Sequence, residues 1–270
     1  MMKQIKYFVL IALMAIAIKA NAQCSFHNEA FSSGEFLSYN LYYNWKFVWV
    51  KAGTASMSIV QSHYRGQQAY RASLTTRGND KVDNMFVLRD TLLCYSSLNM
   101  EPLYFRKGAR EGKHYSVDEV FYGYPGGRVN VRQHRLHNDS SSTWENHTFS
   151  YCVYDMLNIF LRARSFNPDG WKDGHDVDFP IADGNNVAPA KIRYLGKVNI
   201  AADNGRKYRC LKLAYMEKDK SKYKRIVDFY ISDDLNHIPV RLDMYLRFGS
   251  AKAFLVGMKG LRNPVTSQLK

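Results

Sequence analysis

Pairs of carboxylates are the side chains of this sequence with the clearest capacity for chemistry. Asp176 and Asp178 lie two positions apart in the segment DGHDVD, so they share one face of a strand. Asp233 and Asp234 form a second pair after Ser232. Two carboxylates that face one cleft hydrolyse glycosidic bonds or bind calcium. Such segments are also typical of polar turns beside strands, and this structural interpretation is favoured for both.

The histidines and the short motifs indicate no metal or cofactor site. His134 and His137 are three residues apart, which places them on opposite faces of a strand, and His147 follows in the next segment. The sequence has no GxSxG, HExxH, GxGxxG or phosphate-binding loop. We therefore predict no catalytic residue, no metal ligand and no cofactor.

An apolar stripe over residues 37–49 is the most informative pattern. Large side chains alternate there with polar ones such as Asn40 and Asn44, which predicts a single long strand with one apolar face. Such a face either lines a cavity for an acyl chain or fills the core of a barrel. The candidate ligand-binding residues are Tyr39, Leu41, Tyr43, Trp45, Phe47 and Trp49.

The strands that must position these side chains follow from the same period of two. Turn signals such as Arg65-Gly66 and Pro125-Gly126-Gly127 separate short alternating segments. We predict a mainly β protein whose single antiparallel, strongly curved sheet forms a half-barrel or barrel-like structure. Further strands are expected over residues 54–64, 68–76, 87–95, 103–107, 114–122, 128–134, 175–181, 190–200, 207–217, 225–232, 240–247 and 251–259.

One segment changes period. Between residues 153 and 164 apolar side chains recur at spacings of three and four, which predicts an amphipathic helix of about three turns. We expect this helix to pack on an open end or face of the sheet.

The N-terminus has the features of a cleavable secretory signal. Lys3 and Lys6 precede an apolar run over residues 7–18, and Ala20-Asn21-Ala22 suits cleavage after Ala22. The run is shorter than the about 20 residues of a membrane-spanning helix. Gln23 separates Cys24 from the cut, which favours a soluble product over a lipoprotein. We predict residues 1–22 as signal, 23–262 as a single β-rich domain and 263–270 as a flexible tail.

Charge and cysteines agree with a location in the periplasm or outer envelope. The net charge of +14 favours an anionic neighbour, and export favours a lipid or polysaccharide over nucleic acid. An oxidising compartment permits disulfides, although the sequence does not determine a pairing. The candidate cysteines are Cys24, Cys94, Cys152 and Cys210, of which the second and fourth are equally suited to be buried thiols.

Three short patterns, taken in order, resemble a known family. The first is FxxGExLxY over residues 31–39, followed by Ala52-Gly53; the second is YDML over residues 154–157, followed by Arg162. The third is FYISD over residues 229–233, followed by Pro239-Val240. They resemble the exported bacterial family known as domain of unknown function 3108. The resemblance implies an antiparallel half-barrel, akin to the carriers that enclose lipoprotein acyl chains, but those carriers have more helix. It implies no activity.

The positions that carry the resemblance have structural explanations. Gly34 and Gly53 suit bends or close contacts, and Asp155 in the first helical turn favours the helix dipole. Glu35 is expected to pair with a basic residue such as Arg162.

Together these patterns predict a non-enzymatic exported protein that binds a lipid, a lipoprotein acyl chain or an envelope protein. Two alternatives stay open. One is a structural or adaptor subunit of an envelope complex with a fully packed core. The other is an envelope glycan hydrolase that uses Asp176, Asp178 or Asp233.

Overall fold

The computed structural model describes residues 24–45, 48–84, 87–246 and 249–270. The predicted signal over residues 1–22 therefore lies outside the described residues. The helical elements are α2 (Asp80–Asp83), η1 (Pro125–Gly127) and α3 (Met156–Ala163). The strands are β1 (Glu35–Trp45), β2 (Val48–Tyr64), β3 (Gln67–Gly78), β4 (Leu88–Ser97), β5 (Pro102–Glu111), β6 (His114–Gly123), β7 (Val129–Leu136), β8 (Ser142–Phe149), β9 (Asp176–Asp183), β10 (Asn186–Ala201), β11 (Lys207–Asp219), β12 (Lys222–Ser232), β13 (Pro239–Tyr245), β14 (Ser250–Lys259) and β15 (Gln268–Leu269).

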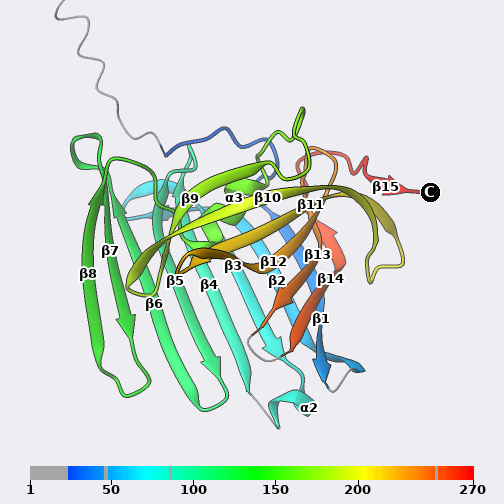
Figure 1. Ribbon diagram of the computed structural model, residues 1–270, viewed down its shortest axis with the longest axis horizontal. Helices are drawn as coiled ribbons and strands as arrows, with labels where there is room; N and C mark the ends of the chain where they lie inside the picture. Colours follow the sequence, from blue (N-terminus) through cyan, green and yellow to red (C-terminus); the bar gives the residue numbers. More distant parts are fainter. Residues whose placement is uncertain (1–23, 46–47, 85–86, 247–248) are drawn as a thin grey trace, which may run out of the picture.

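These strands form one antiparallel sheet, which confirms the predicted fold class. The strand order is β8-β7-β6-β5-β4-β3-β2-β1-β14-β13-β12-β11-β10-β9, and β15 pairs with β11. Each half of the sheet is a meander in which consecutive strands are neighbours (Figure 1). The pairing of β1 with β14 joins the two halves.

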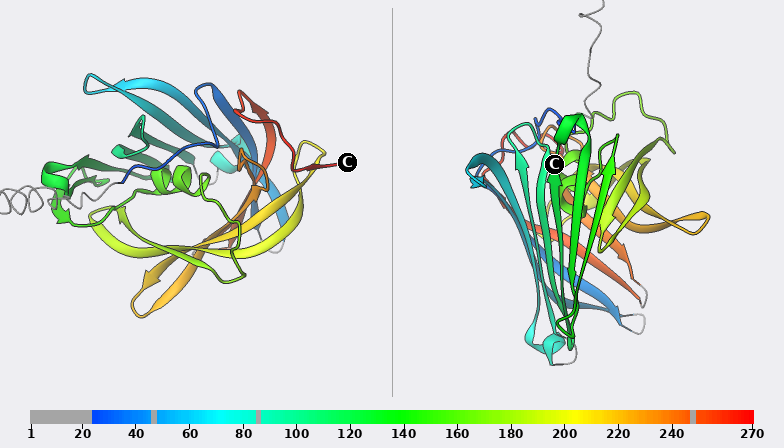
Figure 2. Two further views of the ribbon diagram at one scale, coloured as in Figure 1. Left: turned by 90° about the horizontal axis from the view of Figure 1, so that it is seen from above. Right: turned by 90° about the vertical axis from the view of Figure 1, so that its left-hand side faces the viewer.

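The sheet curls around α3 without closing into a complete barrel. Figure 2 shows α3 inside the ring that the strands describe. The strand order ends at β8 and β9, which do not pair within the described part of the chain. Instead, Gln133 Nε2 on β7 donates to the carbonyl oxygens of Gly184 (2.7 Å) and Asn186 (3.0 Å) at the β9–β10 turn. The two edges therefore meet through a turn rather than through a strand ladder.

The helix α3 is apolar on two sides because it has sheet on two sides. Leu157 and Leu161 are four residues apart and join one buried cluster, whereas Ile159 and Ala163 join a second. Residues four apart lie on the same face of a helix, and residues two apart lie on opposite faces. The helix is thus part of the core rather than a cover on its surface.

The apolar stripe over residues 37–49 is not one strand, contrary to the prediction. β1 ends at Trp45 and β2 begins at Val48, and the two strands pair in antiparallel fashion, so the stripe is divided between two strands. Trp49 pairs with Asn44, and cross-strand partners project from the same face. Trp49 therefore lies on the face opposite to Tyr43. Period two alone does not reveal this hairpin because alternation continues across the connection.

Three other features differ from the predictions: the length of the helix, the presence of β8 and the order of the C-terminal segment. The helix is shorter than residues 153–164, because Tyr154 forms a parallel bridge with Ile181 before the helix begins. β8 was not predicted, since its side chains are polar and mostly exposed at the sheet edge. Residues 263–270 were predicted as a flexible tail, but Ser267 is fully buried and β15 pairs with β11.

Gly34 and Gly53 have the structural roles expected of glycine. Gly34 has a φ of +99°, a region that favours glycine. A Cβ atom on Gly53 would lie 2.1 Å from the carbonyl oxygen of Arg77 on the neighbouring strand. Here the absence of a side chain permits close packing of β2 on β3.

Candidate functional site

The start of α3 is fixed by a buried carboxylate. Asp155 is the N-cap, and its Oδ1 accepts hydrogen bonds from the backbone N–H groups of Leu157 (3.0 Å) and Asn158 (2.8 Å). Its Oδ2 accepts from Asn158 Nδ2 (2.6 Å) and from the hydroxyl of Tyr122 on β6 (3.0 Å). Burial raises the pKa of Asp155 to about 6, although these hydrogen bonds oppose the shift. The helix start is therefore tied to the sheet through polar groups.

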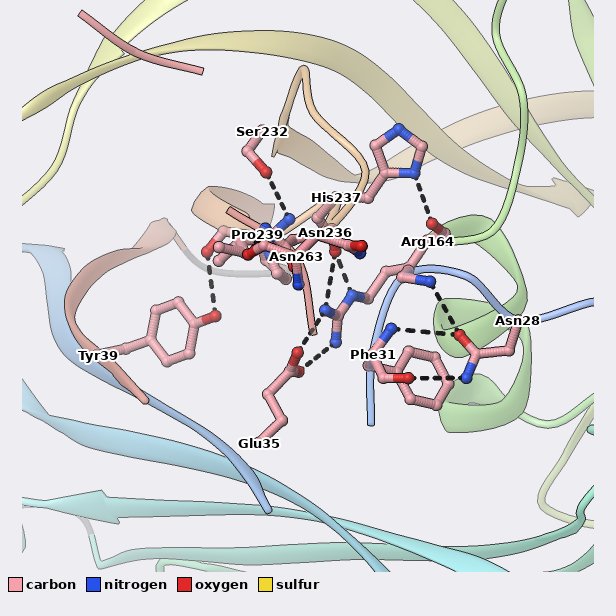
Figure 3. Close-up of polar contacts among 12 residues, drawn as sticks. Asn28, Phe31, Glu35, Tyr39, Arg164, Ser232, Asn236, His237, Pro239 and Asn263 are labelled. Atoms are coloured by element: carbon pink, nitrogen blue, oxygen red, sulfur yellow. Dashed lines mark hydrogen bonds and ion pairs between the residues drawn. The ribbon is translucent and has the colours of Figure 1, made fainter. Parts of the chain in front are cut away.

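The end of α3 is fixed by a buried ion pair, drawn in Figure 3. Arg164, the C-cap, donates to both carboxylate oxygens of Glu35, from Nη1 (2.5 Å) and Nη2 (2.9 Å). Both residues are buried, with exposed fractions of 0% and 1%. A basic partner was predicted for Glu35, with Arg162 as the example; the guanidinium of Arg162 instead lies 5.2 Å from the ring centroid of Tyr154.

The turn before β13 satisfies the remaining donors of Arg164. Its Nη2 donates to the carbonyl oxygen of Asn236 (2.9 Å) and its Nε to that of His237 (3.2 Å). Asn236 in turn donates from Nδ2 to the carbonyl oxygens of Asn263 (2.9 Å) and Pro264 (3.2 Å). One arginine thus joins α3, the start of β1 and, through the Asn236 turn, the C-terminal segment.

Beyond α3, one side of the concave face is apolar. Starting on β1, a row of cross-strand partners runs over β14, β13, β12 and β11. Burial is incomplete in this row, and all of its members except Tyr215 are only half-buried. We call this row and its neighbour nearer α3 the apolar wall. The members are Tyr43, Ala251, Met244, Val227 and Tyr215, then Leu41, Ala253, Leu242, Phe229 and Leu213.

The corresponding rows of the other half of the sheet carry charges. One row of cross-strand partners begins at Leu92 on β4 and continues through Lys107, Asp118 and Arg135. Arg135 Nε lies 2.7 Å from Asp118 Oδ1. Asp90 lies in the next row, and burial together with the charge of Glu111 raises its pKa to about 6. We call Asp90, Lys107, Asp118 and Arg135 the polar wall.

Asp118, the most buried carboxylate of the polar wall, already has a cationic partner. Among the residues that the structure describes, no group of three or more His, Cys, Asp or Glu side chains is arranged to hold a metal ion.

The residues predicted to bind a ligand are divided among three environments. Tyr39 and Leu41 are buried, and the Tyr39 hydroxyl donates to the carbonyl oxygen of Pro239 (3.0 Å). Tyr43 lies at the half-buried end of the apolar wall. Trp49 is on the convex face, where Lys252 Nζ lies 4.2 Å from its ring centroid. Two of the predicted residues remain. Trp45 is the last residue of β1, and Phe47 lies outside the described residues.

The cysteines divide into one pair and two thiols. Cys24 and Cys152 form a disulfide with a Cα–Cα distance of 5.4 Å. It connects the N-terminal segment to the chain just before α3. Cys94 and Cys210 are buried thiols, and burial raises the pKa of each.

Two of the three carboxylates considered for glycan hydrolysis, Asp176 and Asp233, are engaged in ion pairs. Asp176 accepts from Arg193 Nε (2.7 Å), and this pairing lowers the pKa of Asp176 to about 2. Asp233 is held by Arg209 and Lys197, which lower its pKa against the opposing effect of burial. Asp178, the third candidate, is exposed on β9. A glycosidase acid needs a raised pKa, and neither paired carboxylate provides one.

The sequence predicted a candidate site on residues 37–49 alone. It did not indicate that β11, β12, β13 and β14 contribute most of the apolar wall. The alternation in residues 239–245 indicates a strand, but it does not indicate that Leu242 and Met244 lie two strands from Tyr43. The sequence indicated a basic partner for Glu35 but did not single out Arg164.

Comparisons with known proteins agree with this architecture. The profile of the family described as "Protein of unknown function (DUF3108)" matches residues 38–256. The chain belongs to this family. No curated protein matches it. Among solved structures, a beta-barrel-like protein of domain of unknown function DUF1849 from Brucella abortus is similar, with a TM-score of 0.55 and 11% identity. The match covers 85% of this chain and 98% of that chain, and it shows a shared fold.

Proposed function

We propose that this DUF3108 protein is an exported, non-enzymatic binding protein that holds an amphipathic ligand against its concave face. A lipid or the acyl chain of a lipoprotein has the required chemistry. The observation that carries the proposal is the apolar wall, whose row from Tyr43 to Val227 stays half-buried beyond the end of α3.

The dimensions of the elements explain why this row is not covered. An α-helix rises about 1.5 Å per residue, so the eight residues of α3 span only about 12 Å. A strand rises about 3.3 Å per residue, so the 17 residues of β2 span about 56 Å. One short helix therefore covers only one end of the concave face. Covering the remaining apolar surface with an alkyl chain would gain about 25 cal/mol for each Å² buried.

The polar wall supports an amphipathic ligand rather than a purely apolar one. Lys107 and Asp90 lie on the half of the sheet that curls around α3 opposite the apolar wall (Figure 2). Asp90 Oδ1 is buried and has no hydrogen-bond partner. A ligand with a donor group would satisfy this oxygen while its apolar part contacts Met244 and its neighbours.

Two further features support the proposal. The disulfide between Cys24 and Cys152 is the kind of bond that an oxidising compartment allows, in agreement with export. Within the described ranges, no helix combines the length and apolar character needed to cross a membrane. The burial of Tyr39 and Leu41 favours the alternative of a structural subunit for that part of the stripe alone.

Fluorescence titration with dansyl-labelled undecanoic acid tests the proposal, with palmitate as competitor. We expect wild-type protein to give a blue-shifted emission that palmitate reverses. Met244→Lys places a charge in the apolar wall and should weaken binding at least tenfold. Val256→Lys is the matched control, because Val256 is 38% exposed on the neighbouring strand β14.

The outcomes are distinguishable. Absence of binding by wild-type protein, combined with absence of extractable lipid by mass spectrometry of protein from its native host, would contradict the proposal. An equal loss in Met244→Lys and Val256→Lys would place the ligand away from the apolar wall. Circular dichroism establishes that both variants are folded.

A further inference from the structure

A row of aromatic side chains crosses the convex face of the sheet. Ring centroids are 5.1 Å apart between Tyr64 and Tyr95, 5.1 Å between Tyr104 and Phe121, and 6.0 Å between Phe121 and Trp144. Tyr104 also stacks on Tyr64, at 5.7 Å, so the contacts are continuous. We call these five residues, which come from β2, β4, β5, β6 and β8, the aromatic ladder.

The ladder lies on the opposite face from the apolar and polar walls. Tyr95, Tyr104 and Phe121 are successive cross-strand partners. Their neighbours Cys94, Phe105 and Val120 are buried in the core, and adjacent residues of a strand point to opposite faces. Cross-strand aromatic pairs stabilise a sheet, which accounts for part of the ladder. Trp144 also stacks on its cross-strand partner His134, with ring centroids 4.2 Å apart, yet its side chain stays 47% exposed at the edge strand.

The ladder ends in a hollow at the edge strand β8. Its volume is about 410 Å³, and its lining includes Phe121, Trp144, Asn130, Arg65 and Arg132. The Arg132 guanidinium carbon lies 4.1 Å from the Trp144 ring centroid, and that of Arg65 lies 5.9 Å from the Phe121 centroid. The hollow thus combines aromatic rings with two guanidinium groups.

Neither guanidinium is neutralised by the protein. Arg65 and Arg132 are exposed, and within the described residues neither has a carboxylate within 4.0 Å. The nearby carboxylate of Glu119 is engaged by the Tyr104 hydroxyl and by His134 Nδ1 (2.8 Å). Two positive charges therefore remain available to an anionic ligand.

The position of Arg65 also favours a role for its side chain. Arg65 and Gly66 form the turn between β2 and β3, with φ values of 49° and 84°. Two-residue turns with positive φ at both positions prefer Asn-Gly. An arginine there is conformationally unfavourable, and its guanidinium contacts Tyr64 and Phe121 of the ladder.

We propose that this hollow binds an acidic saccharide. A sugar ring presents C–H groups to the faces of Trp144 and Phe121, while its carboxylate or sulfate interacts with Arg65 and Arg132. Guanidinium groups are suited to such anions because they present paired N–H donors. Single-stranded nucleic acid also combines negative charge with stacking on aromatic rings, and it is a separate outcome of the test.

The test is titration of the protein with hexameric oligogalacturonate, with the methyl-esterified hexamer as an uncharged control. We expect the acid to bind at least tenfold more tightly than the ester, with an affinity that falls as salt rises. Trp144→Ala and Arg132→Ala should each weaken binding at least tenfold. Tyr115→Ala and Arg110→Ala are matched controls, because these residues are exposed cross-strand partners on β6 and β5 away from the hollow.

Three results would overturn the inference. They are no binding of oligogalacturonate by wild-type protein, equal losses in the control variants, or tighter binding of single-stranded DNA through the same residues. Binding of dansyl-labelled undecanoic acid is measured in the same variants. Since that ligand is assigned to the concave face, its binding should be unchanged, and the two proposals fail independently.

Discussion

The two ends of the concave face differ in how they treat polar and apolar groups. At the end that contains α3, the charged residues Glu35, Arg164 and Asp155 are fully buried, and each has several hydrogen-bond partners. At the other end, apolar side chains such as Met244 and Val227 are only partly buried, and Asp90 has a buried oxygen without a partner. The α3 end therefore buries charged groups, whereas the other end leaves apolar groups incompletely buried.

This difference separates a structural role from a binding role. Burial of charge is costly unless the charge is paired, and the α3 end stabilises Glu35, Arg164 and Asp155 with a bidentate ion pair and a capped helix. The resulting network fixes one helix in one position. Partly buried apolar rows contribute less to stability than fully buried ones, so their presence at the other end favours a role in binding. Three predictions test this distinction.

The largest expected effect is at Glu35. Glu35→Ala leaves the Arg164 guanidinium buried without a carboxylate, which should lower the free energy of unfolding by about 3–5 kcal/mol. Urea denaturation followed by circular dichroism measures this loss. Glu29→Ala is the control, since the Glu29 side chain is 64% exposed, and it should change stability by less than about 0.5 kcal/mol. Similar losses in both variants would show that the ion pair does not fix the α3 end.

A second effect concerns pH. The pKa of Asp155 is raised from 3.8 to about 6, so the folded protein holds this proton more tightly than the unfolded chain. The stability that this contributes is complete below pH 3.8 and is lost as the pH rises through about 6. The full difference is about 3 kcal/mol, at about 1.4 kcal/mol for each pKa unit.

The variant Asp155→Asn isolates this contribution because asparagine is an equally good N-cap. We expect its stability relative to wild type to rise by about 3 kcal/mol between pH 4 and pH 7, measured by urea denaturation at each pH. Asp90→Asn is the companion variant at the other end, since the pKa of Asp90 is also raised to about 6. A relative stability of Asp155→Asn that is the same at both pH values would show that Asp155 has no raised pKa.

The smallest effect should come from the apolar wall. Met57 is buried at 3% exposure, and Met57→Ala should lower the free energy of unfolding by about 2–5 kcal/mol. Met244 is half-buried, and Met244→Ala should cost about 1 kcal/mol. Thermal and urea denaturation of the two variants compare the same truncation at the two kinds of site. Equal losses would show that the row of Met244 belongs to the packed core.

Much of the fold was predictable because its signals are local. Alternation and turn residues predicted most strands, and spacings of three and four predicted the helix that became α3. The polar edge strand β8 was missed because its side chains are exposed on both faces and lack an apolar alternation. The stripe over residues 37–49 was assigned to one strand because a two-residue connection preserves parity.

The candidate site was less predictable because its contacts are distant in sequence. Glu35 was expected to pair with a basic residue such as Arg162, and its partner is Arg164, the C-cap two residues further along the chain. Successive residues of a helix turn by 100°, so these two arginines point about 200° apart, and only the packing of α3 selects one of them. The aromatic ladder likewise joins residues from five strands, none of which is marked by its local pattern.

The sequence by itself determined the strand-rich class, the family and the presence of one short amphipathic helix, because periodicity and motif order are properties of neighbouring residues. Only the tertiary structure decided which strands adjoin, that α3 lies inside the curled sheet, and that Tyr39 and Trp49 lie on opposite faces. The physical reason is that strand register and helix orientation minimise the free energy of contacts between distant segments. Those contacts place one part of the apolar stripe in the packed core, another part in the apolar wall, and Trp49 on the convex face.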